Sequence, residues 1–165
     1  MLPHSQDPSD SAQSQMGFEE QELTHHLFGI CLEIHQRLGA GLNQNAYEEA
    51  LEHELRAREF FFERNKSLTV DYRGNKIENA STLSFLIENS LVVEILSQPE
   101  IGATERRSMK TKLGLSNNKT GLLVNFDVSE LREGLVKVVI SDQNTAAKIS
   151  EKKEAANKAD SAKTW

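Results

Sequence analysis

The sequence predicts an α/β protein with a mixed central sheet flanked by helices. Apolar residues recur at helical spacing in two early segments, which predicts two helices. Short apolar runs bounded by turn residues fill the rest of the chain, and one polar segment of helical character separates them. The predicted order is helix, helix, three strands, helix, strand, strand, which is typical of an α/β domain.

The helices are predicted from their periodicity and stop signals. The first runs over about 20–38, where apolar side chains repeat every three or four residues, and Gly39 ends it. The second spans about 43–58. The third covers 103–114 and has few apolar positions.

The strands are predicted from alternation and from buried apolar runs. Residues 60–72 are extended and lead into a turn at 73–76. Two apolar strands joined by a Glu-Asn-Ser turn lie within 81–96. Segments 120–126 and 135–140 are two further strands.

Composition predicts one folded domain between two tails. We expect residues 1–19 to form a disordered N-terminal tail, because they are rich in Ser, Gln, Asp and Pro. The folded unit is expected over 20–142. Residues 143–165 have almost no large apolar side chains and are expected to be disordered or transiently helical.

The charge and cysteine content bound the function. A net charge of −6 argues against broad non-specific binding of nucleic acid, which needs an excess of Lys and Arg. The single cysteine, Cys31, excludes an internal disulfide and a cysteine-rich metal site, and we expect it in the core. No apolar run is long enough to cross a bilayer and no signal peptide is present, so a cytoplasmic protein without a membrane partner is expected.

The most informative residue is Glu94, a carboxylate inside an apolar strand. Burying such a group is costly unless something pairs with it. Either it is the remnant of a site and nearly solitary, or it is a structural acid at a strand edge or paired with Lys or Arg. Leu96, two residues on, is expected on the same strand face as Glu94, since alternate side chains share a face.

Four phrases, in order, resemble a known family: Glu33–Leu42, Tyr47–Leu51, Leu91–Ile95 and Gly121–Phe126. They are similar to the bacterial GxxExxY family, a branch of the PD-(D/E)XK nuclease superfamily. The resemblance implies a restriction-endonuclease-like core. It also implies positions for a helix glutamate, two strand acids, a lysine and a later glutamine, which fall on Gln44, Ser84, Glu94, Leu96 and Ser108.

Only one of those positions is acidic, so the resemblance implies a degenerate site. The first hypothesis is an inactive nuclease-like domain that binds or scaffolds and needs no cofactor. The alternative is a Mg²⁺-dependent nuclease whose rearranged site uses Glu94 with Glu48 or Glu49. A third hypothesis is a structural module that binds a protein partner or forms a homodimer.

Basic residues on the third predicted helix are the candidates for contact with nucleic acid. Arg106, Arg107, Lys110 and Lys112 place positive charge on that helix, where they either meet phosphates or form a solvated face. Tyr47 is expected to pack, with its hydroxyl hydrogen-bonded.

Overall fold

The computed structural model describes residues 8–141, and its described side chains begin at Glu19. The predicted order of elements is confirmed, with one short 3₁₀ helix added. The elements are α1 (Pro8–Leu38), α2 (Gln44–Ala57), β1 (Phe62–Tyr72), β2 (Asn75–Ile87), β3 (Leu91–Leu96), α3 (Ala103–Ser116), β4 (Thr120–Asn125), η1 (Leu131–Gly134) and β5 (Leu135–Val139).

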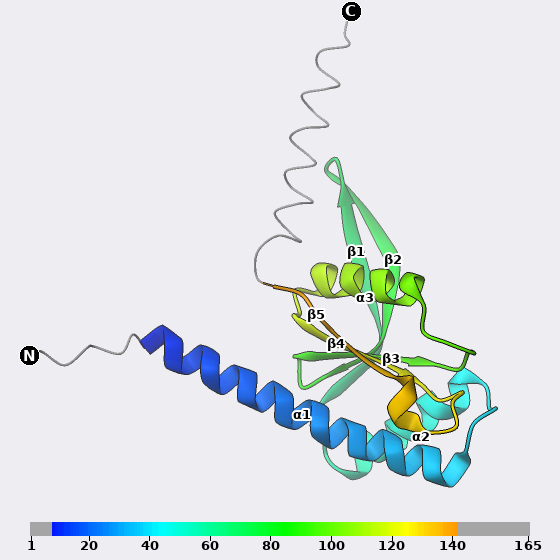
Figure 1. Cartoon of the computed structure of the whole chain (residues 1–165). Coiled ribbons are helices and arrows are strands. Elements are labelled where there is room, and N and C mark those ends of the chain that lie inside the picture. The colour runs from blue at the N-terminus through cyan, green and yellow to red at the C-terminus, as the bar shows by residue number, and fades with distance from the viewer. Residues whose placement is uncertain (1–7, 142–165) are drawn as a thin grey trace, which may run out of the picture.

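The five strands form one mixed sheet in the order β1-β2-β3-β4-β5. Strands β3 and β4 are parallel, and the other neighbouring pairs are antiparallel. Parallel neighbours need a crossover, and α3 supplies it. Helices α1 and α2 cover one face of the sheet and α3 lies across the other (Figure 1). The predicted α/β class with a mixed central sheet is therefore confirmed.

Each face of the sheet has its own core. The larger cluster, under α1 and α2, includes Leu27, Ile30, Cys31, Tyr47, Leu51, Phe85, Val93, Ile95 and Phe126. The smaller cluster, under α3, consists of Leu68, Leu83, Leu86, Val92, Met109, Leu113, Leu123 and Val138. The two clusters explain why β3 and β4 read as continuous apolar runs, since both their faces are covered.

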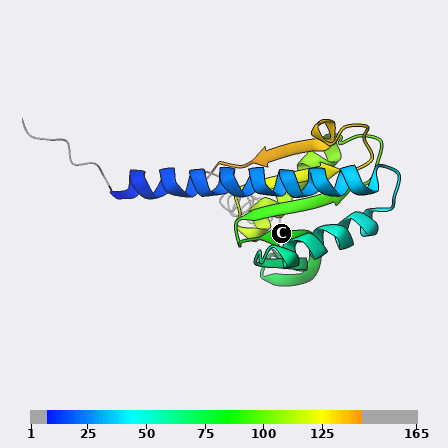
Figure 2. The same ribbon diagram turned by 90° about the horizontal axis from the view of Figure 1, so that it is seen from below.

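Helix α1 begins at Pro8, so the predicted start near Glu20 is wrong and residues 8–19 are helical. Proline suits the first turn of a helix because its missing N–H has no partner there anyway. Gly17, in the segment that follows, costs about 1 kcal/mol relative to alanine and does not stop the helix. Figure 2 shows this end of α1 extending past the sheet. Residues 1–7 of the predicted N-terminal tail, and the whole predicted C-terminal tail at 143–165, lie outside the described residues.

Strands β1 and β2 form a long hairpin that projects beyond the sheet (Figure 1). Leu68 is the last buried residue of β1, and residues 71–80 are all exposed. Tyr72 lies at the tip and is 60% exposed. The pairing register shifts between Leu68 and Val70, so a bulge separates the packed base from the projecting arm.

Tyr47 and Cys31 behave as predicted. The Tyr47 hydroxyl donates to the carbonyl of Gly39 at 2.7 Å and accepts the Leu42 N–H at 3.1 Å, which ties the α1–α2 connection to α2. Its ring stacks on Phe126, with 4.4 Å between the centroids. Cys31 is fully buried in the core, and burial raises the pKa of its thiol to about 12, which makes it a poor nucleophile.

Candidate functional site

Glu94 lies on the face of β3 that α3 covers. Side chains alternate along a strand, and its same-face neighbours Val92 and Leu96 pack in the smaller core cluster. Val93 and Ile95 point to the opposite face, toward α1 and α2. Glu94 is the buried acid of β3, as predicted.

Three hydrogen-bond donors converge on the Glu94 carboxylate. The backbone N–H of Ser84 donates to Oε1 at 3.1 Å, and the Ser84 hydroxyl donates to Oε2 at 3.0 Å. The ammonium group of Lys112 lies 2.9 Å from Oε2. The side chain of Glu94 is 11% exposed and that of Lys112 is 16% exposed, so water screens the pair poorly. The expectation of a nearly solitary acid is wrong, because Glu94 is paired with Lys112, as the alternative of a pair with Lys or Arg had it.

The register of strands β2 and β3 places Ser84 beside Glu94. Strands β2 and β3 pair as far as Phe85 with Val93, so Ser84 and Glu94 come next to each other just beyond the last paired residues. The Glu94 carboxylate therefore accepts the backbone N–H of Ser84 where a backbone carbonyl would do so in a longer ladder. A serine here positions the carboxylate and adds no charge, whereas an acid would repel it.

Lys112 is the site residue that sequence reasoning misplaced. We expected it on the basic outer face of the helix, but it points inward from α3 to Glu94. The signal was available, because Met109, Lys112 and Leu113 occupy the i, i+3 and i+4 positions of the stripe that faces the sheet. Ser108 lies one turn earlier on α3 and is exposed.

Helix α3 lies close to β4, which fixes the position of Lys112. Gly121 of β4 leaves room for the Met109 side chain, which would have to shift if a Cβ were present there. At the other end of β4, the Asn125 side chain accepts the Gln98 N–H at 3.1 Å and donates to the Gln98 carbonyl at 2.7 Å. Asn125 thus holds the β3–α3 connection as well as ending its strand.

The acids of α2 form a second polar cluster, around Arg64 of β1. The guanidinium group contacts Glu48 at 3.3 Å and Glu49 at 2.6 Å, and it also contacts Glu52. The hydrogen bonds that Arg64 donates to these acids, the one to Glu49 foremost, raise the pKa of Arg64. Gln44 donates to the other oxygen of Glu48 at 2.8 Å. Arg64 was not predicted as part of any site.

Glu94 and the acidic cluster around Arg64 lie on opposite faces of the sheet. Arg64 stacks over Phe85, which belongs to the core under α1 and α2, with 5.8 Å from the guanidinium carbon to the ring centroid. Glu94 faces α3 through Lys112. The structure therefore does not bring Glu94 together with Glu48 or Glu49. Glu94 pairs with Lys112, whereas the acids of α2 contact Arg64.

The Glu94 site does not fit a divalent metal ion. Mg²⁺ needs several oxygen ligands at short distance, and both oxygens of Glu94 already accept hydrogen bonds. Leu96 offers no ligand, and Ser84 offers only a neutral hydroxyl beside the carboxylate. Within residues 8–141 no group of three or more His, Cys, Asp or Glu side chains is arranged to hold a metal ion.

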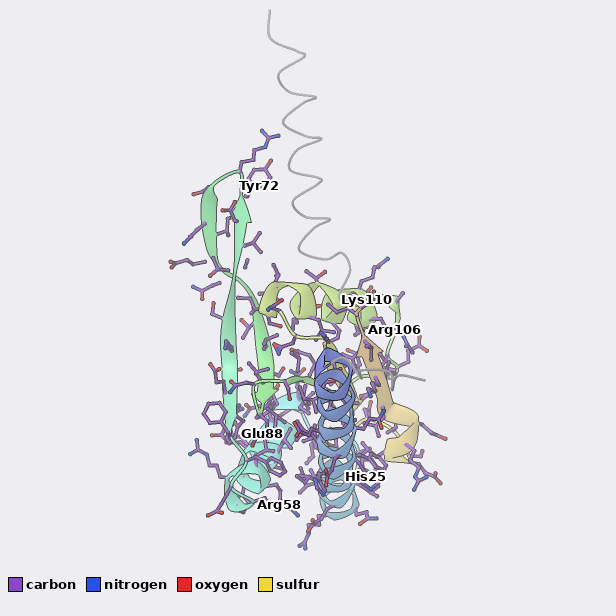
Figure 3. All side chains as sticks on the ribbon, turned by 90° about the vertical axis from the view of Figure 1, so that its left-hand side faces the viewer. His25, Arg58, Tyr72, Glu88, Arg106 and Lys110 are labelled. Atoms are coloured by element: carbon purple, nitrogen blue, oxygen red, sulfur yellow. The ribbon has the colours of Figure 1, made fainter. Side chains whose placement is uncertain are left out.

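The remaining predicted site residues lie on the outer surface of α3. Arg106, Arg107 and Lys110 are exposed, and among the described residues none of them makes an ion pair. Figure 3 shows Arg106 and Lys110 on the same side of the molecule as the hairpin tip, and His25 and Arg58 on the other side. None of the helices in the described part of the chain has the length and apolar character needed to span a membrane.

The comparisons with known proteins place this geometry in a family. No curated protein and no solved structure matches the chain. The family model of the PD-(D/E)XK nuclease superfamily matches residues 21–138, which include every described strand except the last residue of β5. The sheet order, the crossover by α3 and the helices on both faces agree with that match, and the chain therefore belongs to the PD-(D/E)XK nuclease superfamily.

Proposed function

We propose that this chain is a nuclease-like domain that has lost its catalytic constellation and acts by binding, with nucleic acid as the ligand of its basic α3 surface. One observation carries the proposal. The acid at the strand position of the site, Glu94, is fully engaged by Ser84 and Lys112 inside the protein.

The chemistry of phosphodiester hydrolysis explains why that engagement matters. A metal-dependent nuclease uses its ion to lower the pKa of the attacking water and to offset charge on the phosphate. The oxygen ligands for that ion come from carboxylates, and here the neighbouring positions hold Ser84 and Leu96. Glu94 alone, with its charge neutralised by Lys112, is a structural acid.

The outer face of α3 supports the binding half of the proposal. Arg106 and Lys110 are four residues apart, so their charges lie on one face and repel by a few tenths of a kcal/mol. Arg107 adds a third charge beside them. A polyanion would relieve this repulsion and release its counterions on binding. By contrast, the arginines of α2 and β1 are already paired with glutamates.

The alternative of a rearranged Mg²⁺ site gains no support from the geometry. It needs Glu94 beside Glu48 or Glu49, and these acids contact different cations on opposite faces of the sheet. A homodimer or a protein partner remains the third hypothesis, and the experiment below separates it from the first.

The test measures affinity for short labelled DNA and RNA by fluorescence anisotropy over a series of salt concentrations. Arg106→Gln/Lys110→Gln should weaken binding and lower the slope of log K against log salt by roughly 1–2, because two phosphate contacts are lost. Arg37→Gln/Arg56→Gln is the matched control, since it removes the same charge from exposed arginines of α1 and α2.

Three outcomes would contradict the proposal. Equal effects of the two double variants would place binding elsewhere or make it non-specific. Absence of salt-dependent binding in the parent would favour a protein-interaction module. Mg²⁺- or Mn²⁺-dependent cleavage that follows the protein through purification and disappears in Glu94→Gln would mean that the site is active.

A further inference from the structure

At Glu94 the buried charges cancel, and both carboxylate oxygens have hydrogen-bond donors. One carboxylate meets one ammonium group at 2.9 Å, and two further donors from Ser84 satisfy the carboxylate oxygens. Both charged side chains are largely shielded from water. Removing one partner would leave the other as an uncompensated buried charge.

The place of this pair in the fold gives it a meaning beyond packing. The resemblance that places Glu94 at the position of a strand acid implies a residue that serves a divalent metal ion. Here the residues around Glu94 do not fit such an ion, and an ammonium group lies against the carboxylate instead. That ammonium group comes from α3, not from position 96 of β3, which is Leu96.

We propose that the Lys112 ammonium group is the resident cation of the Glu94 site, in the place of a divalent metal ion, so that the folded domain depends on Lys112 and not on metal. The inference deepens the proposed function, because it gives the physical reason why the site binds no catalytic ion. Helix α3 holds Lys112 firmly, since Met109 and Leu113 on either side of it are buried and Met109 packs on Gly121.

The proposal makes opposite predictions for the parent and for a protein without the ammonium group. In the parent, millimolar Mg²⁺ or Mn²⁺ should leave the melting temperature unchanged, because Lys112 already neutralises Glu94. In Lys112→Met, Glu94 should be left uncompensated and the melting temperature should fall by roughly 5 °C. Millimolar Mn²⁺ should then recover part of that loss, because the carboxylate is free to bind it.

Matched variants separate this effect from general damage to α3. Lys110→Met removes the same charge from an exposed position on the same helix and should change neither stability nor the response to metal. Lys112→Arg keeps a cation and should stay insensitive to metal. Lys112→Met/Glu94→Gln removes both charges, so it should be more stable than Lys112→Met and show no response to Mn²⁺.

Defined results would overturn the inference. One is a rise of the parent's melting temperature in Mn²⁺ that is lost in Glu94→Gln. Another is a Lys112→Met protein that is as stable as Lys110→Met and equally indifferent to metal. If Lys112→Met does not fold, the double variant must fold, since failure of both would mean that the lysine acts through packing. These melts contain no nucleic acid, so their failure is distinct from failure of the proposed function, which is judged by binding and cleavage.

Discussion

At the scale of single residues, the partner of Glu94 decides whether replacing this acid by a neutral group stabilises or destabilises the protein. The sequence predicts correctly that a carboxylate lies buried in β3, because an acid flanked by Val and Ile on a strand has few other places to go. It does not predict Lys112 as the partner, because that contact depends on the angle at which α3 crosses the sheet. An unpaired buried acid would be better replaced by a neutral group, whereas a paired one would not.

Glu94→Gln should therefore lower the free energy of unfolding. Glutamine keeps the shape and can accept from Ser84, but it leaves the Lys112 ammonium group without a counter-charge. Because the Lys112 side chain is 16% exposed, we expect a loss of about 1–3 kcal/mol, less than for a fully buried pair. Urea denaturation of both proteins at neutral pH measures it. A variant as stable as the parent would show that water screens the pair.

At the scale of secondary-structure elements, the cluster around Arg64 joins α2 to β1. Arg64 contacts acids from successive turns of the helix, Glu48 and Glu52, and Glu49 between them. Its guanidinium group also covers the ring of Phe85. The helix and the strand were each predicted from periodicity, but this contact joins residues distant in sequence, so no local pattern could reveal it.

The sequence predicts best those elements that have a regular apolar face and a local cap. Helix α2 matches its predicted range closely, because its apolar face is regular and Asn43 caps it by accepting the Ala46 N–H. Helix α1 begins earlier than its apolar pattern predicts, because residues 8–19 are helical without a regular apolar face. Alternation predicts Leu96 on the face of Glu94, whereas Ser84 was placed near Glu94 by the family resemblance.

Arg64→Gln should make the protein less stable at neutral pH, and the difference from the parent should narrow in acid. The pKa of Glu52 lies below its usual 4.5 in the folded protein, because of hydrogen bonds first from Arg56 and then from Arg64. A lowered pKa gives stability that is present above pH 4.5 and is lost as the pH falls through the folded value. Without Arg64 the pKa of Glu52 is lowered less, so ionised Glu52 contributes less stability at neutral pH. The variant therefore loses less stability than the parent when the pH falls.

Urea midpoints measured from about pH 6 to about pH 3 test this prediction. Arg37→Gln is the control, because Arg37 is highly exposed and pairs only with Glu33 in the described structure. It should cost roughly 0–1 kcal/mol. A constant difference between parent and Arg64→Gln across the whole pH range would mean that Arg64 acts through its contact with Phe85 and not through the carboxylates.

At the scale of the whole molecule, the described charges divide between two sides. The acids of α2 and the arginines near them pair with one another on the side of α1 and α2. The cations on the outer face of α3 have no described ion-pair partner and lie on the side toward which the hairpin projects (Figure 3). A molecule with a net charge of −6 can therefore present a basic surface on one side.

The projecting arm of the hairpin should be dispensable for folding. Residues 69–80 contribute no buried side chain, and Leu68 paired with Ser81 is the last pair at the packed base. Joining Leu68 to Ser81 through an Asn-Gly turn, which suits a two-residue hairpin, should change the free energy of unfolding by less than about 1 kcal/mol. An exposed two-stranded ribbon adds little stability of its own, because it buries little apolar surface. Thermal and urea denaturation of the shortened protein measure the change. A large loss of stability would mean that the arm packs against a second copy of the chain. The melting temperature of the parent should then rise with protein concentration.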